Sequence, residues 1–178
     1  MILVFVFCMI AYVGAESSLA YFADTLLTLE MNAPTLGALA ISMYWGTMGI
    51  GRFLFGRAKT IPRNATAISL LCMVVIIIGI IFIHNEYIML IFFALAGFAS
   101  ACVWPGIIHS AVAINRNATG TLLSYLNVGA GMGGAVIPLI IGALWTTSGF
   151  SFSFLVLAAF PLTAGIFMLK NSGKTSKI

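Results

Sequence analysis

The sequence predicts an all-α integral membrane protein, and three observations support this fold class. Hydrophobic residues make up 62% of the chain and charged residues only 7%, whereas about 25% of the residues are charged in a typical soluble domain. The mean hydropathy is +1.15. Apolar stretches of about 20 residues, the length that crosses a bilayer as a helix, recur along the whole chain. A soluble globule of this composition would lack the polar surface that keeps it in solution.

Six of these stretches are predicted to span the membrane. They cover residues 2–28, 36–55, 67–83, 87–114, 121–145 and 152–169, and a basic tail follows at 170–178. The first stretch could be mistaken for a signal peptide. It has no positively charged start, and no small-residue cleavage site follows it. We therefore expect a single six-helix bundle that begins with a true membrane span.

Basic residues predict the orientation of this bundle. The second connection holds four of the eight Lys and Arg residues, the tail holds three and the fourth connection holds one. The four in the second connection are Arg52, Arg57, Lys59 and Arg63. Because Lys and Arg accumulate on the cytoplasmic side of membranes, both termini are predicted to be cytoplasmic, in a plasma membrane. This bias also explains the net charge of +4, so no nucleic-acid partner is expected.

Polar side chains are unevenly distributed over the spans. Tyr12 and Glu16 are four residues apart and share one face of the first span. Spans two, four and five also carry polar or indole groups, whereas the middles of spans three and six carry almost none. Polar groups in a bilayer normally face the bundle interior or a watery cavity. Spans one, two, four and five are therefore predicted to line a solute pathway, with spans three and six facing lipid. The candidate pathway residues are Tyr12, Glu16, Trp45, Ser100, Trp104 and Asn127.

Several of these residues have two interpretations from sequence. Glu16 is either a group that binds a solute or a proton in the cavity, or a buried carboxyl tied to a neighbouring helix. Trp45 and Trp104 either stack on a sugar ring or act as packing and interface anchors. His109 either packs by a hydrogen bond or relays protons.

Glycine and proline residues within the spans are predicted to serve helix packing or bending. They are Gly46, Gly49, Gly51, Gly56, Gly129, Gly131, Gly134, Pro105 and Pro138. Residues 129–134 formally match G-x-G-x-x-G, but they lie inside an apolar span with no preceding strand, which argues against a dinucleotide site. The sequence shows no catalytic constellation and no metal-ligand spacing. We therefore expect no enzyme activity, no metal and no cofactor.

Four segments resemble the C-terminal half of a major facilitator superfamily transporter. They are YVGAESS in span one, YWGTMGIGRFLFGR in span two, GFASACVWPGIIHSA in span four and GAGMGGAVIP in span five. Within this superfamily the likeness is greatest to the fucose-permease-like sugar transporters. The resemblance implies twelve helices in two halves, with the solute site between them. It also implies a cytoplasmic gating loop that includes Arg52, Arg57 and Arg63. The proton-coupling carboxylates of the fucose permease belong to the other half, so the resemblance assigns no such role to Glu16.

These observations lead to one functional expectation with two alternatives. The chain is expected to be one half of a lipid-embedded transporter that moves a small polar solute, first of all a sugar, by symport. An N-terminal half on the same or a separate chain would complete it. The alternatives are half of a drug or metabolite exporter and a truncated membrane fragment that transports nothing.

Overall fold

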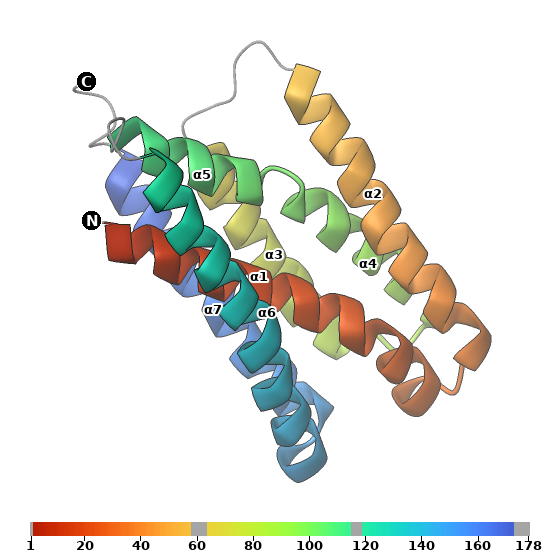
Figure 1. Ribbon diagram of the computed structural model, residues 1–178. Coiled ribbons are helices and arrows are strands. Elements are labelled where there is room, and N and C mark those ends of the chain that lie inside the picture. The colour runs from red at the N-terminus through yellow and green to blue at the C-terminus, as the bar shows by residue number, and fades with distance from the viewer. Residues whose placement is uncertain (1, 58–63, 115–118, 173–178) are drawn as a thin grey trace.

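The computed structural model describes residues 2–57, 64–114 and 119–172, and these residues form helices joined by short turns (Figure 1). The α-helices are α1 (Ile2–Thr25), α2 (Gly37–Arg57), α3 (Ala65–Phe82), α4 (Glu86–Ser100), α5 (Val103–Ile114), α6 (Thr119–Ser148) and α7 (Phe150–Ser172). A π-helical turn, Leu26–Glu30, extends α1, and a 3-10 turn, Pro34–Leu36, leads into α2. The all-α prediction is confirmed for this part of the chain.

Five segments of the described chain are long and apolar enough to cross a membrane. They are Ile2–Glu30, Ala65–Phe82, Glu86–Ala113, Thr119–Ser148 and Phe150–Lys170. Each corresponds to a predicted span, although α7 continues to Ser172 where the tail was expected from residue 170. Helix α2 lies where span two was predicted, but Arg52 and several Gly, Tyr, Trp and Thr residues lower its hydropathy. A sixth span therefore stays a prediction.

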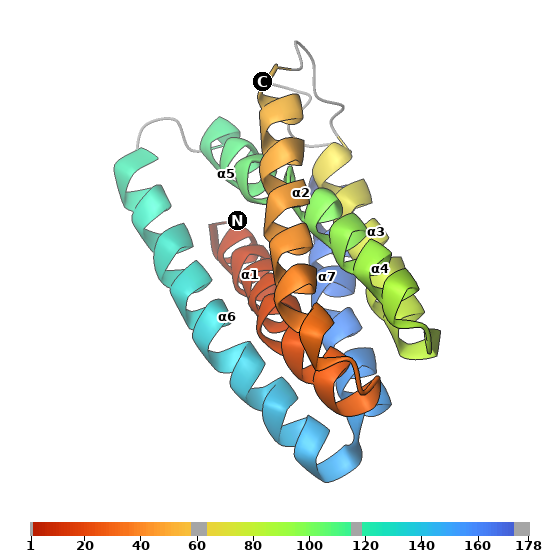
Figure 2. The same ribbon diagram turned by 90° about the vertical axis from the view of Figure 1, so that its right-hand side faces the viewer.

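Helix α1 occupies the centre of the bundle. It packs most closely against α6 and α7, and it also contacts α2 and α5, while α2 packs on α4 and α3 packs on α7. Figure 2 shows α6 on one side and α4 on the other, with α1 and α2 between them. The start of α1 and the end of α7 lie at the same end of the bundle (Figure 1). This arrangement brings the polar faces of α1, α2 and α4 together.

Close helix contacts occur at some of the predicted glycines and at others that were not predicted. A Cβ on Gly133 of α6 would collide with the backbone of Ile10, and a Cβ on Gly97 of α4 would collide with the backbone of Tyr44. Among the predicted glycines, a Cβ on Gly51, Gly129 or Gly134 would lie 3.2 Å or less from a neighbouring side chain. The others meet no atom within 4 Å, namely Gly46, Gly49, Gly56 and Gly131. Packing by these four glycines is therefore not seen within the described chain.

The two predicted proline sites behave differently. Span four is interrupted at Ala101 and Cys102, between α4 and α5, and Pro105 lies in the first turn after this break. Pro138 lies inside α6, which continues through it to Ser148. Span four is therefore interrupted just before Pro105, whereas Pro138 does not end its helix. Proline removes one backbone donor, which packed neighbours in a membrane bundle tolerate.

Candidate functional site

The centre of the candidate site is an ion pair between α1 and α2. Arg52 Nη2 lies 3.6 Å from Glu16 Oε1, and the side chains are 47% and 7% exposed, respectively. Arg52 was grouped with the basic cytoplasmic loop, although it also fell within predicted span 36–55, and the structure places it in α2, which continues two residues beyond that span to Arg57. Its position within the helix puts Arg52 beside Glu16. Its guanidinium offsets the charge of a carboxylate that burial alone would strongly disfavour.

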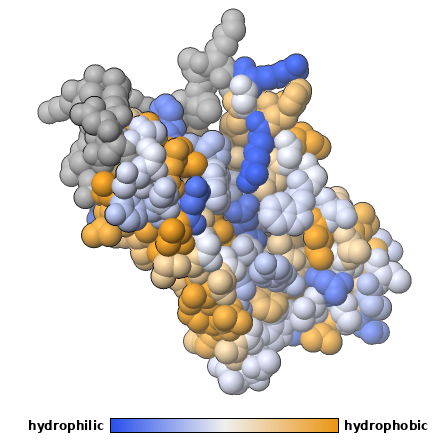
Figure 3. All heavy atoms as spheres, in the orientation of Figure 1, coloured by the Kyte–Doolittle hydropathy of each residue, from blue (hydrophilic) through white to orange (hydrophobic). Residues whose placement is uncertain are grey.

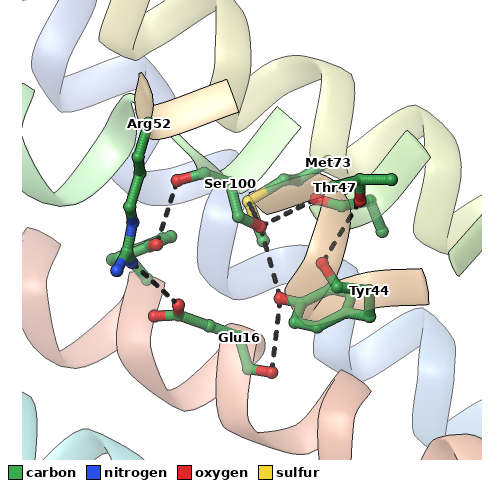
Figure 4. A network of polar contacts seen from close by, with 8 residues as sticks. Glu16, Tyr44, Thr47, Arg52, Met73 and Ser100 are labelled. Atoms are coloured by element: carbon green, nitrogen blue, oxygen red, sulfur yellow. Dashed lines mark hydrogen bonds and ion pairs between the residues drawn. The ribbon is translucent and has the colours of Figure 1, made fainter. Parts of the chain in front are cut away.

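Two tyrosines extend this pair into a network, shown in Figure 4. The Tyr44 hydroxyl lies 3.3 Å from Ser100 Oγ and 3.5 Å from the backbone carbonyl oxygen of Glu16. The Tyr12 hydroxyl donates to the backbone carbonyl oxygen of Ser100 at 3.1 Å. Both tyrosine side chains and Ser100 have no exposed surface. The network therefore joins α1, α2 and the last residue of α4 through fully buried hydroxyl groups.

Neighbouring groups hold Ser100 and Tyr44 in place. The Ser100 hydroxyl donates to the carbonyl oxygen of Ala96 at 2.8 Å and lies 3.5 Å from Met73 Sδ on α3. Because a serine hydroxyl carries one hydrogen, the bond to Ala96 leaves Ser100 Oγ as an acceptor for Tyr44. Thr47, one turn after Tyr44, contacts the carbonyl oxygen of Ala94 at 2.7 Å and so fastens α2 to α4. Polar bonds of this kind hold helices together where lipid supplies no hydrophobic driving force.

The structure brings together three of the six predicted pathway residues. Glu16, Tyr12 and Ser100 share the network, as described above. Trp45 is 47% exposed and packs edge-on against Tyr44, with ring centroids 5.4 Å apart. Trp104 is partly buried in α5, and Asn127 is exposed on α6. Asn127 therefore does not face the polar interior formed by α1, α2 and α4.

The remaining predicted polar residues lie away from this cluster. Arg57 ends α2, with its guanidinium carbon 4.4 Å from the centre of the Phe53 ring. His109 is exposed on α5. Arg63 lies outside the described residues. The hydrophilic atoms on the face drawn in Figure 3 gather mainly in a hollow between α2 and the side formed by α5 and α6.

Sequence reasoning missed three members of the network. Trp45 was chosen instead of its neighbour Tyr44, and Thr47 was not considered. Arg52 was used to predict the orientation in the membrane and was not recognised as a partner of Glu16. Helical spacing offered one signal, because Tyr44, Met48 and Gly51 recur at intervals of four and three residues and all are buried. That spacing marks the face of α2 that meets the bundle.

Comparison with known proteins identifies the family of this chain. The family model described as Major Facilitator Superfamily matches residues 4–177. The chain belongs to the major facilitator superfamily. It is also similar to the glucose/mannose transporter GlcP of Bacillus subtilis (strain 168), with 26% identity over 140 residues. That match covers 78% of this chain and 35% of GlcP, so the matched region corresponds to about a third of the relative.

Membership in the superfamily confirms the resemblance found in the sequence. Together with five helices of spanning length among the described residues, it makes the chain a multi-pass integral membrane protein. The polar network thus lies within helices that sit in a bilayer. In that setting the buried Glu16–Arg52 pair is the main candidate for a functional group, because ionisable residues in spans mark solute or ion pathways.

Proposed function

We propose that the chain forms the C-terminal, six-span half of a plasma-membrane transporter of the facilitator type. It would move a small polar solute by alternating access with an N-terminal half, with a neutral sugar as the first candidate. The observation that carries this proposal is the Glu16–Arg52 pair, which is buried on the Glu16 side and half exposed on the Arg52 side.

The chemistry of the pair suits a neutral, hydroxyl-rich solute. A carboxylate accepts hydrogen bonds from hydroxyls, and a guanidinium donates to oxygen, so the two groups offer complementary contacts to a sugar. Because the two charges of the pair cancel, the site exerts no net electrostatic attraction on a cationic or an anionic solute. Trp45 adds an exposed indole seven residues before Arg52 on α2. Seven residues correspond to about two helical turns, or about 10 Å, and this places both groups on one face.

Similarity to a glucose/mannose transporter supports the choice of hexose as the first solute to test. Symport and the twelve-helix architecture rest on the resemblance to the fucose-permease-like transporters. The cytoplasmic placement of both termini rests on the distribution of Lys and Arg. The same scaffold would serve a drug exporter, which predicts dye efflux instead of sugar uptake.

The proposal is tested by substituting Glu16 in the natural gene. Glu16→Gln is expected to lower the uptake of labelled glucose by about tenfold, since losing one charged hydrogen bond costs about 1.4 kcal/mol or more. Glu86→Gln, in the first turn of α4, is the matched control and should transport normally. Equal uptake by both variants at equal membrane expression would contradict the proposal. Loss of dye efflux with unchanged glucose uptake would favour the exporter.

A further inference from the structure

Span four is interrupted directly after Ser100, a residue that Tyr12 and Tyr44 both contact. Ser100 is the last residue of α4, and its carbonyl oxygen accepts from Tyr12 while its hydroxyl oxygen lies next to Tyr44. Ala101 and Cys102 follow, before α5 begins at Val103. The carbonyl of Ser100 is thus bound by a side chain of α1 at the point where span four is interrupted.

The backbone turns more tightly at the break than in the flanking helices. The Ala101 amide donates to the carbonyl oxygen of Phe98, three residues earlier, at 3.2 Å, whereas the Gly106 amide donates to Cys102, four residues earlier, as in a regular α-helix. Pro105 supplies no amide hydrogen. Local opening of a helix is favoured where its backbone bonds are fewest, so bending of span four would concentrate here.

The ion pair shares its partners with this break. Arg52 of α2 contacts the Glu16 carboxylate, and the Tyr44 hydroxyl of the same helix lies near both the backbone carbonyl oxygen of Glu16 and Ser100 Oγ. Because that hydroxyl carries one hydrogen, it donates to one of these two acceptors at a time. Tyr12, one turn before Glu16 on α1, donates to the Ser100 carbonyl oxygen. Movement of Glu16 relative to α2 would therefore shift the hydroxyl contacts at Ser100.

We propose that Tyr12 and Tyr44 are positioning residues that couple the Glu16–Arg52 pair to the break between α4 and α5. A solute that draws the Glu16 carboxylate away from Arg52 changes the hydroxyl contacts of Tyr12 and Tyr44 with Ser100. Span four then bends more or less easily at the break. This last step rests on the proposed function, because it takes the solute to be the group that competes with Arg52. The link between the pair and the break needs no solute.

Hydrogen–deuterium exchange of the full chain in lipid nanodiscs tests the coupling. Peptides covering residues 98–106 report the break, and peptides from α7 report the bundle as a whole. Tyr12→Phe and Tyr44→Phe are each expected to speed exchange at the break several-fold and to leave α7 unchanged. Tyr125→Phe, on the exposed face of α6, is the matched control and should change neither.

The ion-pair variants separate coupling from simple support of the break. Glu16→Gln and Arg52→Ala are expected to speed exchange at residues 98–106, whereas Arg52→Lys, which keeps the charge, should stay close to the unmodified protein. If Tyr12→Phe and Tyr44→Phe also speed exchange in α7, the comparison of Arg52→Lys with Arg52→Ala tests the coupling instead. Equal exchange at the break in Arg52→Lys and Arg52→Ala overturns the coupling.

Glucose distinguishes this proposal from the function on which it partly rests. Added glucose is expected to change exchange at the break in the unmodified protein and in Tyr125→Phe, but not in Tyr44→Phe. If glucose changes exchange in no peptide, the proposal that the solute is a sugar is contradicted. If glucose changes exchange at residues 98–106 but Glu16→Gln does not, the coupling is overturned.

Discussion

Arg52 of α2 reaches the Glu16 carboxylate of α1 at 3.6 Å, so an ion pair joins two helices of the bundle. Glu16 is almost fully buried, whereas nearly half of the Arg52 side chain is exposed. The guanidinium therefore lies at the boundary between the packed interior and the open face of α2 that also carries Trp45. Arg52 is thus only half covered by this chain while it compensates the charge of Glu16.

Removing Arg52 should destabilise the protein more than removing Arg57. Arg52→Ala leaves a buried carboxylate without its counter-charge, which costs about 3–5 kcal/mol when both partners are fully buried. Because Arg52 is half exposed, we expect a loss of about 1–3 kcal/mol in the free energy of unfolding. Thermal unfolding in detergent measures this loss. Arg57→Ala, at the end of α2, is the control.

A double-mutant cycle checks that the loss comes from the pair. In Glu16→Gln the carboxylate charge is absent, so a further Arg52→Ala substitution should cost less than it does in the unmodified protein. Additive losses in the double variant would mean that the two side chains do not interact in the membrane.

Two glycines of α6 that are two residues apart should respond oppositely to alanine. Gly133→Ala places a Cβ against the backbone of Ile10 and should destabilise the α1–α6 contact by about 1–3 kcal/mol, the usual cost of overpacking. Gly131→Ala meets open space within this chain and should be neutral or slightly stabilising, as alanine favours helix. Unfolding midpoints of the two variants measure the difference. Equal effects would show that α1 and α6 do not pack as described.

The orientation of the chain can be tested by single cysteines at helix ends. Asn32 lies between the π-helical and 3-10 turns and Ser148 ends α6, and both are exposed. Positive-inside bias predicts that cysteines at these two positions react with an impermeant thiol reagent added outside cells. A cysteine at Ser172, the last residue of α7, should react only in opened membranes. The reverse pattern would invert the predicted topology.

Removing the Thr47 hydroxyl should loosen the contact between α2 and α4. Thr47→Val keeps the shape of the side chain but loses its contact with the carbonyl oxygen of Ala94. Interhelical hydrogen bonds in membranes contribute about 0.6 kcal/mol on average, and we expect an unfolding loss of that order. Thr47→Ser retains the hydroxyl and serves as the control. A loss of stability in Thr47→Ser but not in Thr47→Val would assign the effect to packing of the methyl group instead.

Much of the fold could be predicted from the sequence because apolar length is a strong signal in membranes. Five predicted spans coincide with helices of spanning length, and the interruption of span four lies close to Pro105. Span two is the exception, since the Gly, Tyr, Trp, Thr and Arg residues that build the site also lower the hydropathy of α2. The same composition that weakens the signal for a span is what makes α2 contribute to the site.

The site itself was only partly predictable. Glu16 and Tyr12 were found because helical spacing puts them on one face, and Ser100 because it is polar within a span. The partnership of Glu16 with Arg52 could not be read from spacing, since the two residues belong to different helices and their contact depends on how α1 and α2 cross. Asn127 lies apart from this network on the exposed face of α6, because the face that a helix turns toward its neighbours cannot be read from one polar residue.

Accessibility of position 49 to a charged thiol reagent tests the central claim most directly. Gly49 lies on α2 between Trp45 and Arg52, with open space above it, while the native Cys72 is exposed on α3, the helix predicted to face lipid. In the protein expressed from its natural gene, Gly49→Cys should react with a charged reagent, glucose should slow that reaction, and Cys72 should stay unmodified. If Cys72 and a cysteine at position 49 are equally unreactive, the open face of α2 borders lipid or protein, and no aqueous solute pathway passes Glu16 and Arg52.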